Sequence, residues 1–222
     1  MWDCGLACTL MVLRVLGNTH TQLSDLVHSL GTESVWTVDL ARLLAQHGAP
    51  VTLCTTSPGV RNDYAAVPFY RDQLANDRTR VEAAFRGLPP EVSLHVGSLS
   101  VSTLLNLVLS ARVLLVLLVD KAQLTHCQGD VEHARENGID GYLGHYVVVL
   151  GADLDQDALV VADPARAEWS SVRVPIPQLE RARKAHGTDE DILIIHLPDR
   201  LTPVKISSDH GVEDRKGDGR EV

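Results

Sequence analysis

The chain has 222 residues, of which 45% are hydrophobic and only 4% aromatic, and its formal net charge is −9. This length and apolar content are enough for one domain with a substantial core. The acidic balance, without any cluster of lysines and arginines, argues against a nucleic-acid-binding or membrane-binding surface. We therefore expect neither nucleic acid nor membrane among the partners.

Cysteine usage indicates the compartment. Cys4, Cys8, Cys54 and Cys127 form no CxxC pair and have no zinc-finger spacing. The N-terminus lacks the charged region and cleavage site of a secretory signal, and the longest apolar run, residues 113–119, is too short to span a bilayer. These features predict a reduced, cytoplasmic protein without disulfides.

Helical patterns dominate the first ninety residues. Thr21 or Thr19 is expected to cap the second helix and Thr37 the third, while Asn76-Asp77 could break the fourth. Alternating apolar residues predict one strand here, and the stretch 56–68 reads as a loop. The predicted helices cover residues 5–17, 22–30, 38–47 and 69–86, and the strand covers residues 51–55.

Strands dominate the second half. The run 113–119 consists of leucine and valine, which indicates a strand buried on both faces. The polar stretch 121–141 is predicted to be a long loop, and the charged, glycine-rich residues 199–222 a disordered tail. Helices followed by a sheet predict an α+β fold in one domain over residues 1–198. The predicted strands are 92–96, 113–119, 145–151, 158–162 and 192–197, with helices over 103–110, capped by Ser102, and 178–186.

Cys4 stands where the first helix begins. A cysteine in that position meets the positive end of the helix dipole and unpaired backbone N–H groups. Both favour thiolate over thiol, which is the form that acts as a nucleophile. A cysteine at the head of an apolar helix is more often a packed thiol, as we expect for Cys8 one turn later. The catalytic interpretation of Cys4 therefore depends on partners elsewhere.

His145 and Asp163 are the candidate partners. His145 begins a predicted core strand after Gly144, and Asp163 ends the next strand before Pro164. Taken singly, the histidine is an ordinary strand residue and the Asp-Pro pair an ordinary strand end. Taken with Cys4, they form a nucleophile, a base and a group that orients the base. The three predict a thiol hydrolase or transferase that acts on a peptide or amide bond and needs no cofactor.

Other polar residues have weaker signals. Cys54 lies on a predicted strand and Cys127 in a predicted loop, and we assign neither a chemical role. His126 and His133 could contact a ligand. The three consecutive acids at 189–191 favour a solvated turn over a Mg²⁺ site. The chain contains neither a Walker-type phosphate loop nor a G-x-G-x-x-G motif.

Several longer strings resemble one family. They resemble the soluble guanylyl cyclase family of plants and the related guanylyl cyclase domain-containing protein of animals, with order and spacing kept from Trp2 to Leu197. The resemblance implies conversion of GTP to cyclic GMP and pyrophosphate, normally with Mg²⁺. The strings are WDCGLAC, MVLR, SVWTVDLARLL, TRVEAAFR, GHYVVVLG, ADPA and HGTDEDILIIHL.

The fold that this resemblance implies is similar to the papain-like peptidase domain that trims double-glycine leaders. In that domain a DCG motif carries the nucleophile, GHY the base and Asp-Pro the orienter, which correspond to Cys4, His145 and Asp163. The family's glutamine six residues before the cysteine would precede Met1. Since losing one oxyanion donor costs about a hundred- to a thousandfold in rate, we expect an N-terminal segment to be missing.

The two implications require different chemistry. Cyclisation needs metals or basic groups that neutralise the triphosphate, and the sequence shows neither paired carboxylates at metal spacing nor a basic phosphate cradle. We therefore favour thiol chemistry on a peptide or amide substrate. A guanylyl cyclase that uses GTP and Mg²⁺ is the alternative, and an impaired interaction module is the second alternative. The oligomeric state stays open.

Overall fold

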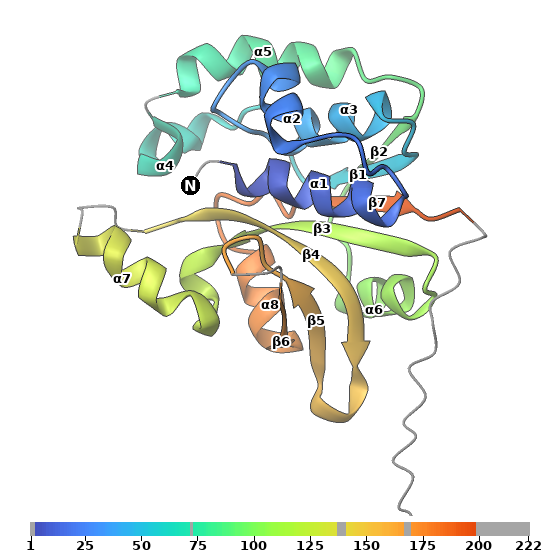
Figure 1. Ribbon diagram of the computed structural model, residues 1–222. Helices are drawn as coiled ribbons and strands as arrows, with labels where there is room; N and C mark the ends of the chain where they lie inside the picture. The colour runs from blue at the N-terminus through green and yellow to red at the C-terminus, as the bar shows by residue number, and fades with distance from the viewer. Residues whose placement is uncertain (1–2, 72, 137–140, 167–169, 199–222) are drawn as a thin grey trace, which may run out of the picture.

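The computed structural model describes residues 3–71, 73–136, 141–166 and 170–198, so the predicted tail 199–222 lies outside the described residues. A twisted sheet runs through the middle, with helices on both faces (Figure 1). The strands follow one another in the order β2-β1-β7-β3-β4-β5-β6. Among the described residues their bounds are Val51–Thr55 (β1), Val92–Val96 (β2), Val113–Asp120 (β3), Gly144–Asp153 (β4), Ala158–Ala162 (β5), Ser171–Pro175 (β6) and Ile192–His196 (β7).

The sheet is mixed but mainly antiparallel. Only β1 and β2 pair in parallel among the described strands, and the other neighbours are antiparallel. The last strand, β7, lies near the centre, between β1 and β3. The α+β architecture and the mostly antiparallel sheet predicted from sequence are confirmed.

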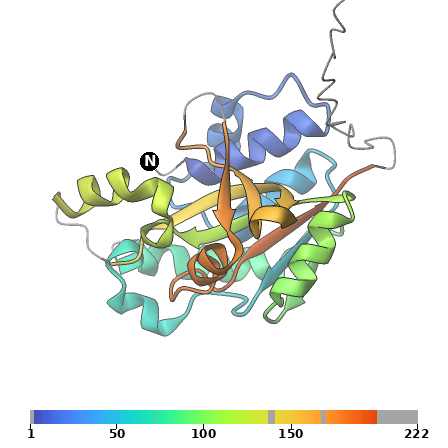
Figure 2. The ribbon, with the colours of Figure 1, turned by 90° about the horizontal axis from the view of Figure 1, so that it is seen from below.

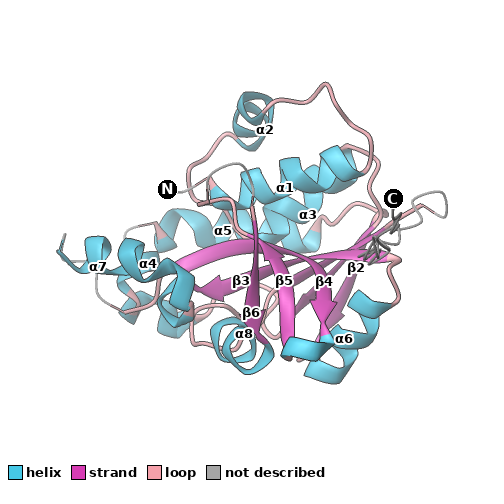
Figure 3. Ribbon diagram, turned by 60° about the horizontal axis from the view of Figure 1, so that its bottom comes forward, coloured by secondary structure: helices cyan, strands magenta, loops and turns pink. Residues whose placement is uncertain are grey.

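The helices form two layers. One face carries α1 (Cys4–Val15), α2 (Leu23–Leu30), α3 (Thr37–Gln46), α4 (Pro68–Arg71) and α5 (Leu74–Arg86). The other face carries α6 (Val101–Leu109), α7 (Gln128–Glu136) and α8 (Ile176–Arg183), as the views in Figures 2 and 3 show. Short 3-10 turns cover Asn62–Ala66, Lys121–Gln123, Thr125–Cys127 and Leu154–Gln156.

Strand β3 connects the two cores. Leu114, Val116 and Leu118 belong to the core beneath α1 and α3. Leu115 and Leu117 belong to the core on the side of α6 and α8. Because successive strand residues point to opposite faces, a strand covered on both sides needs an uninterrupted apolar run. The prediction that this run is buried on both faces is confirmed.

The stretch 121–141 is not a loop as predicted, since two 3-10 turns and helix α7 fill most of it. Helix α7 has few apolar residues to give a helical period, and Val131 is its buried anchor. The predicted helix 69–86 is two helices, α4 and α5, and Tyr70 of α4 stacks on Tyr64 with ring centroids 4.6 Å apart. Asn76-Asp77, which could have broken this helix, lies inside α5.

Smaller corrections concern caps and one edge strand. Gln22, not Thr21 or Thr19, precedes α2, and Thr37 is the first residue of α3 rather than its cap. Ser100, not Ser102, caps α6 by accepting a hydrogen bond from the Thr103 N–H. Strand β6 was not predicted because it lies at the sheet edge, where its burial leaves only Val174 fully covered. Val172 and Val174 alternate with polar residues, but over a run too short to predict a strand.

Gly5 allows α1 to approach the sheet. A Cβ at this position would lie 2.8 Å from Leu40 Cδ1 and 3.0 Å from Tyr146 Cδ2. We expect Gly5→Ala to lower the free energy of unfolding by about 1–3 kcal/mol, because the packed neighbours must move. Urea denaturation measures this change. Gly129→Ala in α7 is the control: it adds the same methyl group to a helix where no atom lies within 4 Å, so equal destabilisation by both variants would contradict the packing argument.

Candidate active site

Helix α1 places Cys4 at the edge of a cleft. Cys4 is the first residue of the helix, and the side chain of the preceding Asp3 makes no capping hydrogen bond. The Gly5 N–H and the Tyr146 N–H are available to the sulfur and lower its pKa. The sulfur therefore lies at the positive end of the helix, as the sequence predicts. Cys8, one turn on, is fully buried, and burial raises its thiol pKa well above the ordinary value.

The β4–β5 hairpin brings the other two predicted residues together. His145 is the second residue of β4, and Asp163 directly follows the last residue of β5. The two strands are antiparallel, with Val148 opposite Ala162, so the start of one lies beside the end of the other. His145 Nε2 lies 2.8 Å from Asp163 Oδ1. Because Nε2 is engaged there, Nδ1 is the ring nitrogen left to interact with Cys4, whose pKa His145 lowers.

The electrostatics favour a charged pair. Burial raises the pKa of Cys4, but the hydrogen bond and positive charge of His145 outweigh it, so the pKa lies below its ordinary value. Burial lowers the pKa of His145, but hydrogen bonds to Asp163 and Cys4 raise it to about 9. Burial raises the pKa of Asp163, yet its two histidine partners hold it far below the usual range. Both shifts favour the thiolate form of Cys4 and the imidazolium form of His145.

Two residues that were given no catalytic role from sequence also contact this group. His126 Nε2 lies 2.9 Å from Asp163 Oδ2, and Cys127 Sγ lies 3.5 Å from the same oxygen. Burial and the nearby Asp163 charge raise the pKa of Cys127 to about 12, so its thiol stays protonated. Asp163 thus accepts on both oxygens, which holds the carboxylate in place for His145. No local pattern in the sequence indicates this contact, because the partners are 37 residues apart.

His133 and Cys54, the other residues considered from the sequence, lie outside the site. His133 lies on an exposed part of α7, next to Glu136. Cys54 is buried in β1, where burial raises its pKa to about 11. Neither lines the cleft that contains Cys4.

The acidic stretch 189–191 is not the solvated turn that was predicted. Asp189 accepts a hydrogen bond from the Tyr64 hydroxyl, Glu190 binds Ser98 and Arg183, and Asp191 is buried. The three carboxylates face different partners, so they do not fit a shared Mg²⁺ site. Among the described residues, the one group of three or more potential metal ligands with all ligand atoms within 4.8 Å of one another is His126, Cys127 and Asp163. Thiol and imidazole ligands suit softer metals than Mg²⁺.

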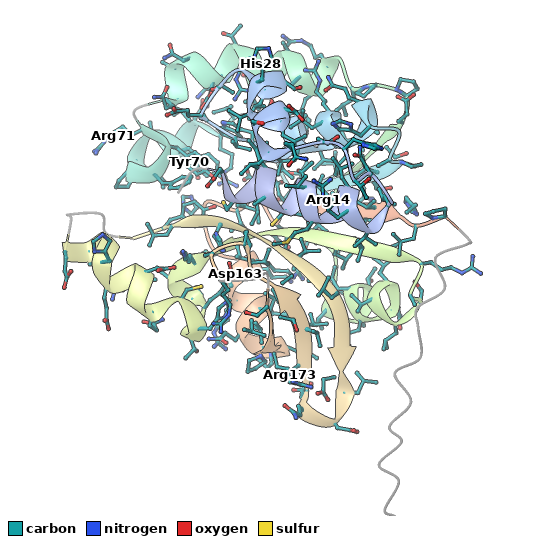
Figure 4. The ribbon with its side chains drawn as sticks, in the orientation of Figure 1. Arg14, His28, Tyr70, Arg71, Asp163 and Arg173 are labelled. Atoms are coloured by element: carbon teal, nitrogen blue, oxygen red, sulfur yellow. The ribbon has the colours of Figure 1, made fainter. Side chains whose placement is uncertain are left out.

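The cleft beside Cys4 has a volume of about 370 Å³. Aromatic rings and carboxylates make up much of its wall, and none of the described residues lining it is lysine, arginine or histidine. Figure 4 shows Tyr70 on the face of the sheet that carries α1 to α5, above the β4 ribbon, and Asp163 below that ribbon. The start of α1 lies close to α4, which contributes two of the rings (Figure 1). The rings are Trp36, Phe69, Tyr70 and Tyr146, and the carboxylates are Glu33, Asp77, Asp189 and Asp191.

Two comparisons with known proteins bear on this arrangement. A family model described as guanylylate cyclase matches residues 1–195. The chain belongs to the guanylylate cyclase family. Guanylyl cyclase 1 of Arabidopsis thaliana is 37% identical over 201 residues, which cover 88% of this chain and 72% of that protein. The family resemblance expected from the sequence is confirmed.

The region shared with the guanylylate cyclase family includes the whole candidate site. Cys4, His145 and Asp163 all lie within the matched residues 1–195, as do the acids and rings of the cleft. No helix in the described part of the chain is long and apolar enough to cross a bilayer.

Proposed function

We propose that this member of the guanylylate cyclase family is a thiol hydrolase or transferase with a papain-like arrangement, acting on a peptide or amide bond. The observation that carries the proposal is the set Cys4, His145 and Asp163, in which the imidazole lies 2.8 Å from the carboxylate and lowers the pKa of the Cys4 sulfur. This is the nucleophile, base and orienter geometry of thiol acyl transfer.

Each residue has one role in the reaction. The Cys4 thiolate adds to the carbonyl carbon and forms a tetrahedral oxyanion, which the free N–H groups at the start of α1 stabilise. The imidazolium of His145 gives its proton to the leaving nitrogen as the carbon–nitrogen bond breaks, and a thioester remains. Neutral His145 then takes a proton from water or an acceptor nucleophile, which attacks the thioester and releases the Cys4 thiolate. Asp163 keeps the imidazole oriented throughout.

Guanylyl cyclase activity is the second candidate, and family membership is the observation that favours it. Cyclisation requires the ribose 3′-hydroxyl to attack the α-phosphate while positive groups neutralise the triphosphate. The cleft beside Cys4 offers carboxylates instead, so it does not suit that substrate. We therefore rank thiol chemistry first for this site.

One experiment separates the candidates. The purified chain is incubated with a peptidyl acyloxymethyl ketone, which alkylates activated cysteines, and in parallel with GTP and Mg²⁺. We expect the probe to label Cys4, with the label lost in Cys4→Ala and kept in Cys54→Ala. Labelling spread over several cysteines would refute the thiol proposal. Cyclic GMP formed equally by the parent chain and Cys4→Ala would support the cyclase at a different site, and neither activity would support the interaction module.

A further inference from the structure

Asp191 is unlike the other carboxylates of the cleft. Its side chain lines the same cavity as Cys4, yet the residue is only 7% exposed. The hydroxyls of Thr37 and Thr55 act on the carboxyl group and lower its pKa, but Oδ1 is buried without a hydrogen-bond partner. Its backbone is fixed on both sides: the N–H donates to Thr188 O, and the C=O accepts from the Leu118 N–H at 3.1 Å. The backbone of Asp191 is therefore held at the cleft by its neighbours in the fold.

Two neighbouring carboxylates of the wall already have partners. Asp77 accepts from the Trp36 indole N–H at 3.0 Å and pairs with Arg80 at 3.0 Å. Asp189 accepts from the Tyr64 hydroxyl and lies 4.0 Å from Arg61. A buried polar atom without a partner is costly, and each such atom in a native structure calls for an explanation. A donor supplied by a ligand would explain Oδ1 of Asp191.

The rest of the wall indicates which donor fits. The Trp36 and Tyr70 rings lie with centroids 5.2 Å apart on the same cleft, and Phe69 and Tyr146 also line it. Faces of aromatic rings attract cations, most strongly where water is excluded. The described lining residues include no lysine, arginine or histidine that would compete for Asp191 or attract an anion.

We propose that the cleft selects a substrate with a positively charged amine or guanidinium group, which donates to Asp191 and lies against the aromatic wall. The substrate class is thus a peptide or amide that carries a basic residue or a free amino group near the scissile bond. This inference rests on the proposed thiol chemistry for the identity of the reaction, but the charge preference of the cleft is measurable without any turnover.

The test uses two methanethiosulfonates of similar size, one with an ethyltrimethylammonium group and one with an ethylsulfonate group. Each transfers its thio group to a thiolate and releases methanesulfinate, and peptide mapping reads the rate at Cys4 alone. At pH 8, above the pKa of about 7 that burial gives Asp191, we expect the cationic reagent to react faster. Asp191→Asn should reduce the cation-to-anion rate ratio by about tenfold, the size expected for one charge near a partly buried site.

The matched control is Asp155→Asn, which makes the same change in charge at the exposed turn between β4 and β5. It should leave the ratio unchanged. An unchanged ratio in Asp191→Asn, or equal rates for the two reagents in the parent chain, would overturn the proposal. Asp191→Asn should fold at least as stably as the parent, since it removes a buried charge; Asp191→Ser provides a second neutral variant with the same expected ratio.

Substrate preference gives an independent readout. Aminocoumarin amides that differ only in an arginine, glutamine or glutamate before the scissile bond are compared. Faster cleavage of the arginine amide, with the preference lost in Asp191→Asn, supports the inference. Cleavage without any preference overturns it while leaving the thiol chemistry intact. If no amide is cleaved, the thiol proposal fails, and the reagent ratio alone decides whether the cleft prefers cations.

Discussion

Cys4 is expected to react with iodoacetamide at pH 7 on the order of a thousandfold faster than Cys127, although both border cavities. The reason is the thiolate fraction. His145 lowers the pKa of Cys4, whereas burial and Asp163 raise that of Cys127 to about 12. Peptide-resolved mass spectrometry between pH 5 and pH 10 measures each cysteine separately. A Cys4 rate that rises with pH in parallel with that of Cys127 would contradict the ion pair.

The pH profile of amide cleavage follows from the same pair. The lower limb reflects protonation of the Cys4 thiolate and lies below the ordinary cysteine pKa, because the folded site favours the thiolate. The upper limb lies at about pH 9, where His145 loses the proton that the leaving nitrogen needs. Alkylation, which needs no proton donor, should not decline at the upper limb. This difference between the two profiles distinguishes the role of His145 from that of Cys4.

Asp163→Asn is expected to reduce amide cleavage by about a hundred- to ten-thousandfold. The substitution removes the charge that raises the pKa of His145, and it replaces one of the two accepting oxygens with an NH2 group, which cannot accept from either histidine. The imidazolium is then less stable, the pKa of Cys4 rises, and its alkylation profile should shift towards higher pH. The measurement is the cleavage rate together with the alkylation profile of Cys4.

The control for this prediction is His126→Asn. His126 contacts Oδ2 of Asp163, while His145 contacts Oδ1, so the substitution leaves the carboxylate charge and the His145 hydrogen bond in place. We expect a loss of less than about tenfold, since only the second restraint on the carboxylate is removed. Equal alkylation profiles for Asp163→Asn and the parent chain would refute the orienting role of Asp163.

The strands that the sequence predicts well are those with two buried faces. Strand β3 and the apolar part of β4 are covered on both sides, so their residues are almost all apolar and the pattern is unambiguous. Strand β6 and helix α7 each bury few side chains. Their positions depend on packing against neighbours distant in sequence, and single-sequence patterns do not contain that information.

The residues of the candidate site also differ in how well the sequence predicts them. Cys4, His145 and Asp163 stand at ends of regular elements, so a helix start and a hairpin predict that they meet. The contact of His126 with Asp163 depends on a turn whose path the sequence does not specify. The burial of Asp191 was not predicted, because three adjacent acids are typical of a solvated turn. Only the packing of the fold shows that the third acid is enclosed.

The central position of β7 has a consequence for synthesis of the protein. The pair β1 and β2 is connected to the group β3, β4, β5 and β6 only through β7, which is the last of these strands in the sequence. Asp191 directly precedes β7. A nascent chain therefore holds the cysteine helix and the histidine hairpin before the strand that unites the sheet has left the ribosome. Until β7 inserts, the sheet is in two pieces, and the part of the cleft wall that Asp189 and Asp191 supply is not yet in place. The cleft beside Cys4 is therefore complete only when nearly all of the described sequence has been made.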